Sequence, residues 1–416
     1  MRNSSQNLVV DAARLWDTLV ETARIGGTPR GGIRRLTLTD LDREVRDWFR
    51  REVEALGCTV AVDEVGNMFA RRPGRRDDLD PIAMGSHLDT QPTGGRFDGN
   101  LGVLAGLEVL RTLHDLNYET NAPLVLVNWT NEEGARFPPA MLGSGVWAGV
   151  FDRAYADSRQ DRDGTTFAQA IEAIGYRGEV PAGSVRLGAM VELHIEQGPV
   201  LEAEGLAIGV VEGVQAMRWY ELRLTGRESH AGSTPMALRR DALVAAARIV
   251  TAVDALARAH GPAGVGTVGI LDAQPGSRNV IPGEVFLTVD LRHPDDAVLA
   301  RMEADLRAAV AEGEAGGVAV EFARTWDSPA VRFDPGVVAA IRSGAARAGL
   351  STRTMVSGAG HDAAYTARRI PTAMIFVPCA GGLSHNEAEA TSPEECAAGA
   401  QVLLNAVLEI DARFAP

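Results

Sequence analysis

Short apolar runs that end in polar or glycine-rich turns, and then lead into helical patterns, constrain this chain more than any other feature. Four of these runs are rich in aliphatic residues and cover residues 81–90, 122–134, 186–198 and 372–378. A helical pattern over residues 100–116 follows the first of them. Aliphatic strands that alternate with helices are typical of a mostly parallel sheet covered by helices. The sequence therefore predicts an α/β domain.

A different pattern occupies the middle of the chain. The predicted order there is strand, helix, strand, strand, helix, strand, over residues 219–226, 237–260, 264–273, 284–293, 296–314 and 318–325. This is the order of the ferredoxin-like split βαβ arrangement, an α+β fold. The α/β pattern then returns, with helices predicted over residues 336–349 and 392–414. The ferredoxin-like segment is thus expected to be an insertion.

The length of the chain also favours two domains, because 416 residues exceed the size at which one hydrophobic core usually stops growing. We expect a catalytic, metal-binding domain of residues 1–213 and 328–416, with an inserted domain of residues 214–327. The inserted domain has one helix-covered face and a sheet edge that needs protection. Pairing across a two-fold axis would protect it, so a homodimer is expected.

Charge and cysteine content narrow the classes of partner. The net charge of −14 disfavours nucleic acid and anionic membrane surfaces and favours a small-molecule substrate. The first residues lack the pattern of a secretory signal, and no apolar run approaches the roughly 20 residues of a membrane span. Cys58, Cys379 and Cys396 have no CxxC spacing and are expected to be reduced thiols. A cytoplasmic location is the expectation.

Five glycine-flanked segments carry histidine or carboxylate side chains at predicted strand ends and in loops. They are GSHLDT, GGRFDGN, NEEG, ELHIEQG and GGLSHNEAE. Loops at the carboxyl ends of strands converge in open α/β sheets. Imidazole and carboxylate donors without cysteine suit Zn, Mn, Co or Ni. A single histidine at a strand end is more often structural, so the prediction rests on the set: His87, Asp98, Glu133, His194 and His385. Five ligands can serve two ions if one carboxylate bridges them.

These segments, together with NEEGARF, SHAGSTP, RNVIPGE and SGAGHDA, resemble the M20-type metallopeptidase clan and, within it, the carbamoylase/hydantoinase-type amidases. That group holds N-carbamoyl-L-amino acid hydrolases, β-ureidopropionases and allantoate amidohydrolases. The resemblance runs in order from about His87 to the C-terminus. It implies a two-metal amidohydrolase that releases a free amino acid, CO2 and ammonia from an N-carbamoyl amino acid.

The same resemblance assigns the metal ligands and the base. Asp98 would bridge the ions, with His87 and His194 on one ion and Glu133 and His385 on the other. The ions would hold a water whose pKa is lowered toward neutrality. Glu132 would be the general base that takes its proton; the alternative is a solvated acid at a loop tip.

Asp89 and His194 carry two further expectations. Asp89 follows His87 by two residues and would accept a hydrogen bond that orients the imidazole, although a turn or helix-cap role is a rival interpretation. By resemblance, peptidase relatives carry an acid at the position of His194. The histidine therefore points toward the amidase branch.

The substrate residues come from both predicted domains. Arg292 can grip a carboxylate bidentately, although a surface salt bridge is the commoner role of an arginine. By resemblance, His230 and Asn279 donate to the substrate carbonyl or the developing oxyanion, with His230 reaching across a dimer interface. Gln197 and Gly360 would complete the pocket with His361, which could equally cap a helix.

The choice of substrate stays open at this level. N-carbamoyl-α-amino acids and N-carbamoyl-β-alanine fit the residues equally, and allantoate, a related ureido acid, or another small amide are alternatives. A metal-binding scaffold without activity is a rival of another class, because fold does not fix function. Retention of Glu132 beside a full ligand set argues against that rival.

Overall fold

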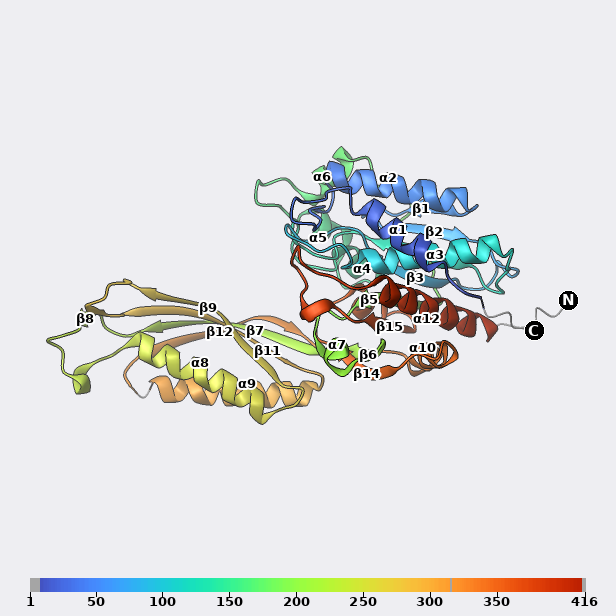
Figure 1. Ribbon diagram of the computed structural model, residues 1–416. Helices are drawn as coiled ribbons and strands as arrows, with labels where there is room; N and C mark the ends of the chain where they lie inside the picture. Colours follow the sequence, from blue (N-terminus) through green and yellow to red (C-terminus); the bar gives the residue numbers. More distant parts are fainter. Residues whose placement is uncertain (1–7, 315, 414–416) are drawn as a thin grey trace. The chain divides into compact units, whose positions relative to one another are not determined.

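The chain divides into two compact units, each drawn in Figure 1. The computed structural model describes residues 8–314 and 316–413. Unit 1 comprises Met1–Gly213 and Arg332–Pro416, and unit 2 comprises Val214–Val331. The predicted fold class is confirmed, because unit 1 contains a largely parallel sheet between helices and unit 2 an antiparallel sheet with helices on one face.

The sheet of unit 1 has the strand order β1-β2-β4-β3-β5-β15-β6-β13, with β14 paired to β6. Its central strands β4, β3, β5 and β15 run parallel, and the flanking pairs β1–β2, β2–β4 and β15–β6 are antiparallel. Every residue of the four central strands is buried, which explains their continuous apolar character in the sequence. The strands are β1 Thr59–Val62, β2 Met68–Arg72, β3 Ile82–His87, β4 Leu124–Trp129, β5 Ala189–Ile195, β6 Ile208–Val214, β13 Val331–Arg332, β14 Thr352–Ser357 and β15 Thr372–Val377.

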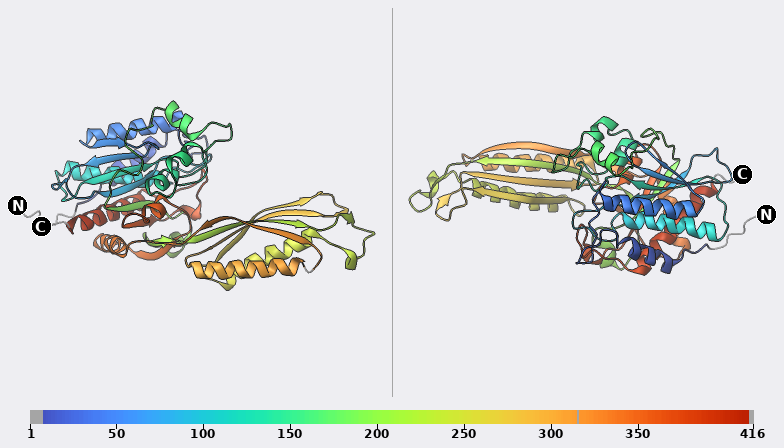
Figure 2. Two further views of the ribbon diagram at one scale, coloured as in Figure 1. Left: turned by 180° about the vertical axis from the view of Figure 1, so that it is seen from behind. Right: turned by 90° about the horizontal axis from the view of Figure 1, so that it is seen from above.

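Helices cover both faces of this sheet, as the two views of Figure 2 show. Helices α3 and α12 pack against β3, β5 and β15, and Trp147 of α4 joins Phe69 and Trp129 in a buried cluster. The helix starts are specified locally: Thr39 caps α2, and Ser392 forms a capping box with Glu395 at α12. The helices are α1 Ala12–Thr22, α2 Asp40–Ala55, α3 Asn100–Asp115, α4 Leu142–Trp147, α5 Arg153–Asp157, α6 Phe167–Ala173, α7 Val200–Glu204, α10 Pro335–Arg347, α11 Asp362–Thr366, α12 Pro393–Ala412 and the 3₁₀ turn η2 Ala380–Gly382. The predicted end of the last helix, Phe414, lies outside the described residues.

Unit 2 has the ferredoxin-like strand order β12-β7-β11-β9, with antiparallel neighbours throughout. Alternate residues such as Tyr220, Leu222 and Leu287 point into the core, as expected for a sheet covered on one face. Helices α8 and α9 pack on that face, and the short pair β8–β10 lies at one end of the unit (Figure 1). The elements are β7 Ala216–Thr225, β8 Ser229–His230, η1 Met236–Leu238, α8 Ala242–Ala259, β9 Val265–Gln274, β10 Val280–Ile281, β11 Glu284–His293, α9 Asp296–Glu314 and β12 Ala319–Ser328.

Two smaller expectations concern the membrane and the thiols. No helix among residues 8–314 and 316–413 is long and apolar enough to cross a membrane. Cys58, Cys379 and Cys396 are free and buried, in agreement with the expected reduced thiols.

Candidate metal centre

The five predicted ligands are brought together at the carboxyl ends of the central strands of unit 1. His87 ends β3 and His194 lies near the end of β5, whereas the others come from the loops before α3, after β4 and after η2. Among the described residues, the candidate metal groups include His87–Asp98–His194 and Asp98–Glu133–His385. The predicted ligand set therefore forms two groups that share one carboxylate.

Asp98 lies between the two groups. Its Oδ1 is 3.1 Å from His194 Nε2 and 3.7 Å from His87 Nε2, whereas its Oδ2 is 3.4 Å from His385 Nε2. Glu133 Oε2 is 3.5 Å from the same His385 nitrogen. Each group thus offers imidazole nitrogen and carboxylate oxygen, the donors that borderline divalent transition metals accept. The residues fit two ions.

Glycine at position 99 is required for the loop of Asp98 to lie close to the His87 ring. Gly99 has a φ of 65°, and a Cβ built there would lie 2.3 Å from the His87 ring. Any side chain would therefore push the loop that carries Asp98 away from His87.

Three other residues of the centre have left-handed backbone without being glycine. They are Asn131, Gln197 and His385, with φ values of 59°, 56° and 54°. Asn131 is held by a hydrogen bond from its Nδ2 to the carbonyl oxygen of Phe137, at 2.8 Å. Such conformations are uncommon and persist where surrounding contacts impose them.

Hydrogen bonds to backbone carbonyls orient the two buried imidazoles. His87 Nδ1 lies 2.9 Å from the carbonyl oxygen of Asp89, and His194 Nδ1 lies 2.9 Å from that of Ile195. The Asp89 carboxylate, predicted to be the acceptor, is 3.9 Å from His87 Nδ1. It instead accepts hydrogen bonds from the backbone N–H groups of Glu132 and Glu133. Residue 89 thus orients His87 through its main chain and positions the NEEG turn through its side chain.

Glu132 points into the same centre, with Oε2 3.4 Å from His87 Nε2. Burial raises the pKa of Glu132 well above its usual value, and the nearby carboxylates of Asp362 and Glu133 raise it further. The pKa of Glu133 is raised for the same reasons, with Asp98 as the leading neighbour. Burial also raises the pKa of Asp89 to about 7. This concentration of buried acids is what a site for cations requires, because positive ions would relieve the repulsion.

The surroundings shift the pKa values of His87 and His194 in opposite directions. Burial lowers the pKa of His87 to about 4. Burial also opposes a charge on His194, but the hydrogen bond and charge of Asp98 outweigh it and raise the pKa of His194 to about 9. The proximity of Asp98 therefore favours protonation of His194, and a proton there would compete with an ion.

Several residues that sequence reasoning missed support the ligands. Gln91 donates its backbone N–H and its Nε2 to the Glu133 carboxylate, at 3.1 and 2.6 Å. Glu192 is fully buried behind His194 and accepts from Ser86 Oγ and from the backbone N–H of Ala363. An acid inside the apolar run AMVELHI was the available signal for Glu192, since unpaired burial of a carboxylate is costly.

The predicted pocket residues of unit 1 lie near the centre. Gln197 Nε2 donates to Asp98 Oδ2 at 2.9 Å, and its Oε1 has no hydrogen-bond partner among the described residues. Gly360 is exposed, directly before His361. The His361 side chain makes no helix-capping hydrogen bond; its ring is buried, bonded to Ser357 Oγ, and 4.5 Å from the His194 ring between centroids.

The predicted substrate residues of unit 2 fall into two places. His230 and Asn279 lie together, because Ala231 N–H donates to the Asn279 carbonyl at 2.9 Å. His230 Nδ1 accepts from the backbone N–H groups of Gly232 and Ser233, which leaves Nε2 as the protonated, donating nitrogen. Arg292 lies near the far end of β11 and is paired with Asp290 at 2.6 Å. The structure does not bring Arg292 near His230 within one chain.

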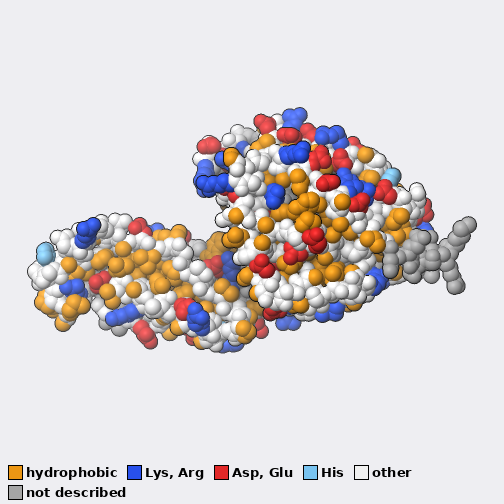
Figure 3. Space-filling view, viewed as in Figure 1, with side chains coloured by type: hydrophobic (Ala, Val, Ile, Leu, Met, Phe, Trp, Pro, Cys, Tyr) orange, Lys and Arg blue, Asp and Glu red, His pale blue; other side chains and the backbone are white. Residues whose placement is uncertain are grey.

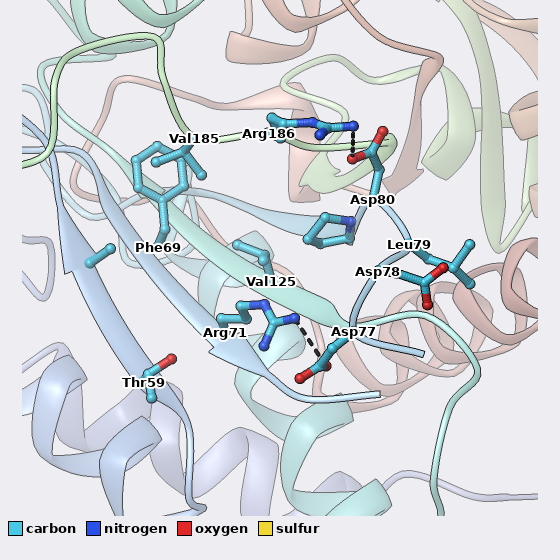
Figure 4. A pocket seen from close by; sticks show the side chains of 12 residues that line it. Thr59, Phe69, Arg71, Asp77, Asp78, Leu79, Asp80, Val125, Val185 and Arg186 are labelled. Atoms are coloured by element: carbon cyan, nitrogen blue, oxygen red, sulfur yellow. Dashed lines mark hydrogen bonds and ion pairs between the residues drawn. The ribbon is translucent and has the colours of Figure 1, made fainter. Parts of the chain in front are cut away.

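A cavity of about 340 Å³ in unit 1 is separate from this centre. Figure 4 shows its apolar floor of Phe69, Val125 and Val185, with the ion pairs Arg71–Asp77 and Arg186–Asp80 at its rim. Val125 lies at the start of β4, whereas the ligands follow strand ends. The cavity is therefore at the opposite end of the sheet from the ligands.

A largely parallel sheet that gathers two linked donor groups beside a further carboxyl is an arrangement that suits a metal-dependent hydrolase. Residues 83–409 match the peptidase family M20/M25/M40. The chain is 50% identical to the N-carbamoyl-L-amino-acid amidohydrolase of Rhizobium meliloti over 98% of this chain and 99% of that protein. It is 36% identical to the allantoate amidohydrolase of Escherichia coli, over 93% and 95%. A crystal structure of a hydantoinase/carbamoylase family amidase from Burkholderia multivorans aligns with a TM-score of 0.95 and 54% identity, over 97% and 98%.

The chain belongs to the M20/M25/M40 family and, within it, to the hydantoinase/carbamoylase amidases, and is therefore a hydrolase. The resemblance found in the sequence motifs is confirmed.

Proposed function

We propose that this protein hydrolyses the carbamoyl amide of N-carbamoyl amino acids, with two divalent ions held by the groups that share Asp98. The position of Asp98 carries this proposal, because its two oxygens face different histidines at 3.1 and 3.4 Å. When bound, such ions polarise a carbonyl and lower the pKa of a water. Zn, Mn, Co and Ni all suit the donors.

Glu132 is the proposed general base. Its raised pKa makes it a stronger proton acceptor, and its position beside His87 Nε2 directs it into the centre. Glu132 would take a proton from the attacking water and give it to the leaving nitrogen. The carbamoyl C–N bond to that nitrogen breaks and ammonia leaves; the carbamate that remains loses CO2 and frees the amino acid.

Gln197, His230, Asn279 and Arg292 are the proposed substrate residues. A carbamoyl group is rich in N–H donors, and Gln197 Oε1 is a buried acceptor without a partner among the described residues. His230 offers its Nε2–H to the substrate carbonyl, because Nδ1 is already accepting. Arg292 would hold the carboxylate, with Asp290 orienting its guanidinium. Gly360 would line the same pocket.

The length of β11 supports a homodimer in which His230 acts in the partner's site. The pair β8–β10 follows the end of the sheet where Glu284 pairs with Thr225, whereas Arg292 pairs with Met217 at the other end. The eight residue steps from Glu284 to Arg292 span about 26 Å, at about 3.3 Å each. The carboxylate and carbonyl of a carbamoyl amino acid are only a few bonds apart. One substrate therefore needs His230 and Arg292 from different chains.

The surface of unit 2 supports the same proposal. Strand β9 ends the sheet order and exposes Val265, Ile270 and Leu271, by 46%, 52% and 43%. Hydrophobic side chains are prominent over this unit in Figure 3. An apolar sheet edge of this kind is commonly covered by a partner. Unit 2 would thus serve as the dimerisation and lid domain.

The substrate class is tested by ammonia release. Protein loaded with Mn²⁺ is incubated with N-carbamoyl-α-amino acids, N-carbamoyl-β-alanine and allantoate, with Glu132→Gln as the matched control. We expect the highest kcat/KM with an N-carbamoyl amino acid. Release from allantoate alone would favour the function of the Escherichia coli relative, and no release from any of them would refute the proposal.

A further inference from the structure

Glu389 links two loops of the metal centre that are far apart in the sequence. Its side chain is buried, at 2% exposure. Oε1 accepts from the backbone N–H groups of Phe97 and Asp98, at 3.1 and 3.0 Å, and Oε2 accepts from Ser384 Oγ at 3.1 Å. One carboxylate therefore connects the loop of the bridging ligand to the residue before His385.

The loop of His385 depends on this link. The His385 side chain is 53% exposed, far more than those of Asp98 and Glu133. Ser384 Oγ lies 3.2 Å from Asp98 Oδ2 as well as 3.1 Å from Glu389. A hydroxyl has one proton, so it donates to one of these carboxylates at a time. When Ser384 donates to Glu389, Asp98 Oδ2 accepts only from Gln197 Nε2 and keeps a lone pair for an ion.

The absence of a side chain at Gly95 makes room for the Glu389 carboxylate beside the loop of Asp98. A Cβ on Gly95 would lie 2.1 Å from Glu389 Oε1, so only glycine lets the backbone pass beside the acid. Glu387, two residues earlier on the same loop, instead lies 3.7 Å from Arg30. Glu389 and Glu387 therefore lie on the same loop, but of the two only Glu389 has these contacts with the loop of Asp98 and with Ser384.

We infer that Glu389 is a positioning residue that fixes the separation of Asp98 and His385, and thereby the affinity of the ion held by Asp98, Glu133 and His385. The inference rests on the ligand assignment of the proposed function. Partners that orient metal ligands typically contribute about 10- to 100-fold in metal affinity. The ion held by His87 and His194 depends less on Glu389, because backbone carbonyls orient those rings.

The experiment measures Mn²⁺ binding to metal-free protein by chelator competition, without reference to activity. Wild-type protein should bind two ions. Glu389→Ala should weaken the ion of Asp98, Glu133 and His385 by about 10- to 100-fold. It should weaken the other ion less, because Asp98 is the only ligand of that ion that Glu389 contacts. Ser384→Ala breaks the link between Glu389 and the His385 loop but keeps the bonds of Glu389 to Phe97 and Asp98, so it should weaken the same ion by less. Glu387→Gln is the matched control and should bind as wild type does.

The outcomes separate this inference from the proposed function. Wild-type protein that binds no Mn²⁺ would overturn both. Two ions in the wild type, with unchanged affinities in Glu389→Ala and Ser384→Ala, would overturn only the role of Glu389. An equal loss in Glu387→Gln would do the same, because it would indicate general loosening of the loop. If Glu389→Ala does not fold, Ser384→Ala decides alone.

Discussion

Mixing two inactive variants should restore activity if His230 acts across the dimer. Glu132→Gln removes the proposed base and should lower turnover by at least about 10²-fold. His230→Ala removes the proposed oxyanion donor and should lower turnover by about 10²- to 10³-fold. In a mixed dimer, one site carries both lesions and the other carries neither. Random exchange of equal amounts makes about half of the dimers mixed, so the mixture should reach about a quarter of wild-type activity.

The assay is ammonia release after subunit exchange, with exchange verified by mass spectrometry of the intact dimers. The control mixes Glu132→Gln with Glu133→Ala, two lesions in the same metal centre of one chain. Each site of that mixed dimer keeps one lesion, so no activity should return. If subunits exchange but the mixture with His230→Ala recovers no activity, the argument from the length of β11 is refuted, and His230 does not act in the partner's site.

Four further predictions follow from the structure. Because the raised pKa of His194, about 9, lets a proton compete with the ion, apparent Mn²⁺ affinity in chelator competition should rise from about pH 7 to 9; flat affinity would contradict this. The same raised pKa stabilises the metal-free fold. This contribution is fully present below about pH 6.5 and is lost as the pH rises through about 9. The Tm of the metal-free wild type should therefore fall more over this pH range than the Tm of His194→Gln. Arg292→Lys should raise KM at least about tenfold for substrates with a free carboxylate but little for their amides, because an ammonium cannot form the two-point contact; equal losses in steady-state kinetics would indicate a structural role. Asp411→Ala should lower the free energy of unfolding by about 1–3 kcal/mol in urea titrations, because the buried backbone N–H of Ala122 loses its acceptor; unchanged stability would contradict this.

The fold of unit 1 could be predicted from the sequence, because the central strands are buried on both faces of the sheet and therefore consist of continuous apolar runs. The same logic placed His87, Glu133 and His194 at strand ends, where a parallel sheet gathers its ligands. In unit 2, the order of strands and helices predicted a sheet with one helix-covered face, and burial alternates along residues 284–293 as such a sheet requires.

The supporting contacts could not be predicted, since hydrogen bonds between distant loops have no local pattern. Glu389 binds the backbone of Asp98 across 291 residues, and nothing in GLSHNEAE distinguishes it from Glu387. The role of Asp89 was assigned to its side chain, whereas its main chain contacts His87, because sequence does not reveal which atoms of a residue face a ligand.

The left-handed backbone at Asn131, Gln197 and His385 has a consequence for protein design. Part of the information for this centre lies in main-chain conformations that non-glycine residues adopt only at a cost of order 1–3 kcal/mol each. Grafting the five ligand side chains onto another α/β scaffold would therefore not reproduce the site. A transplanted centre would also need the loops that bend the chain at these three positions.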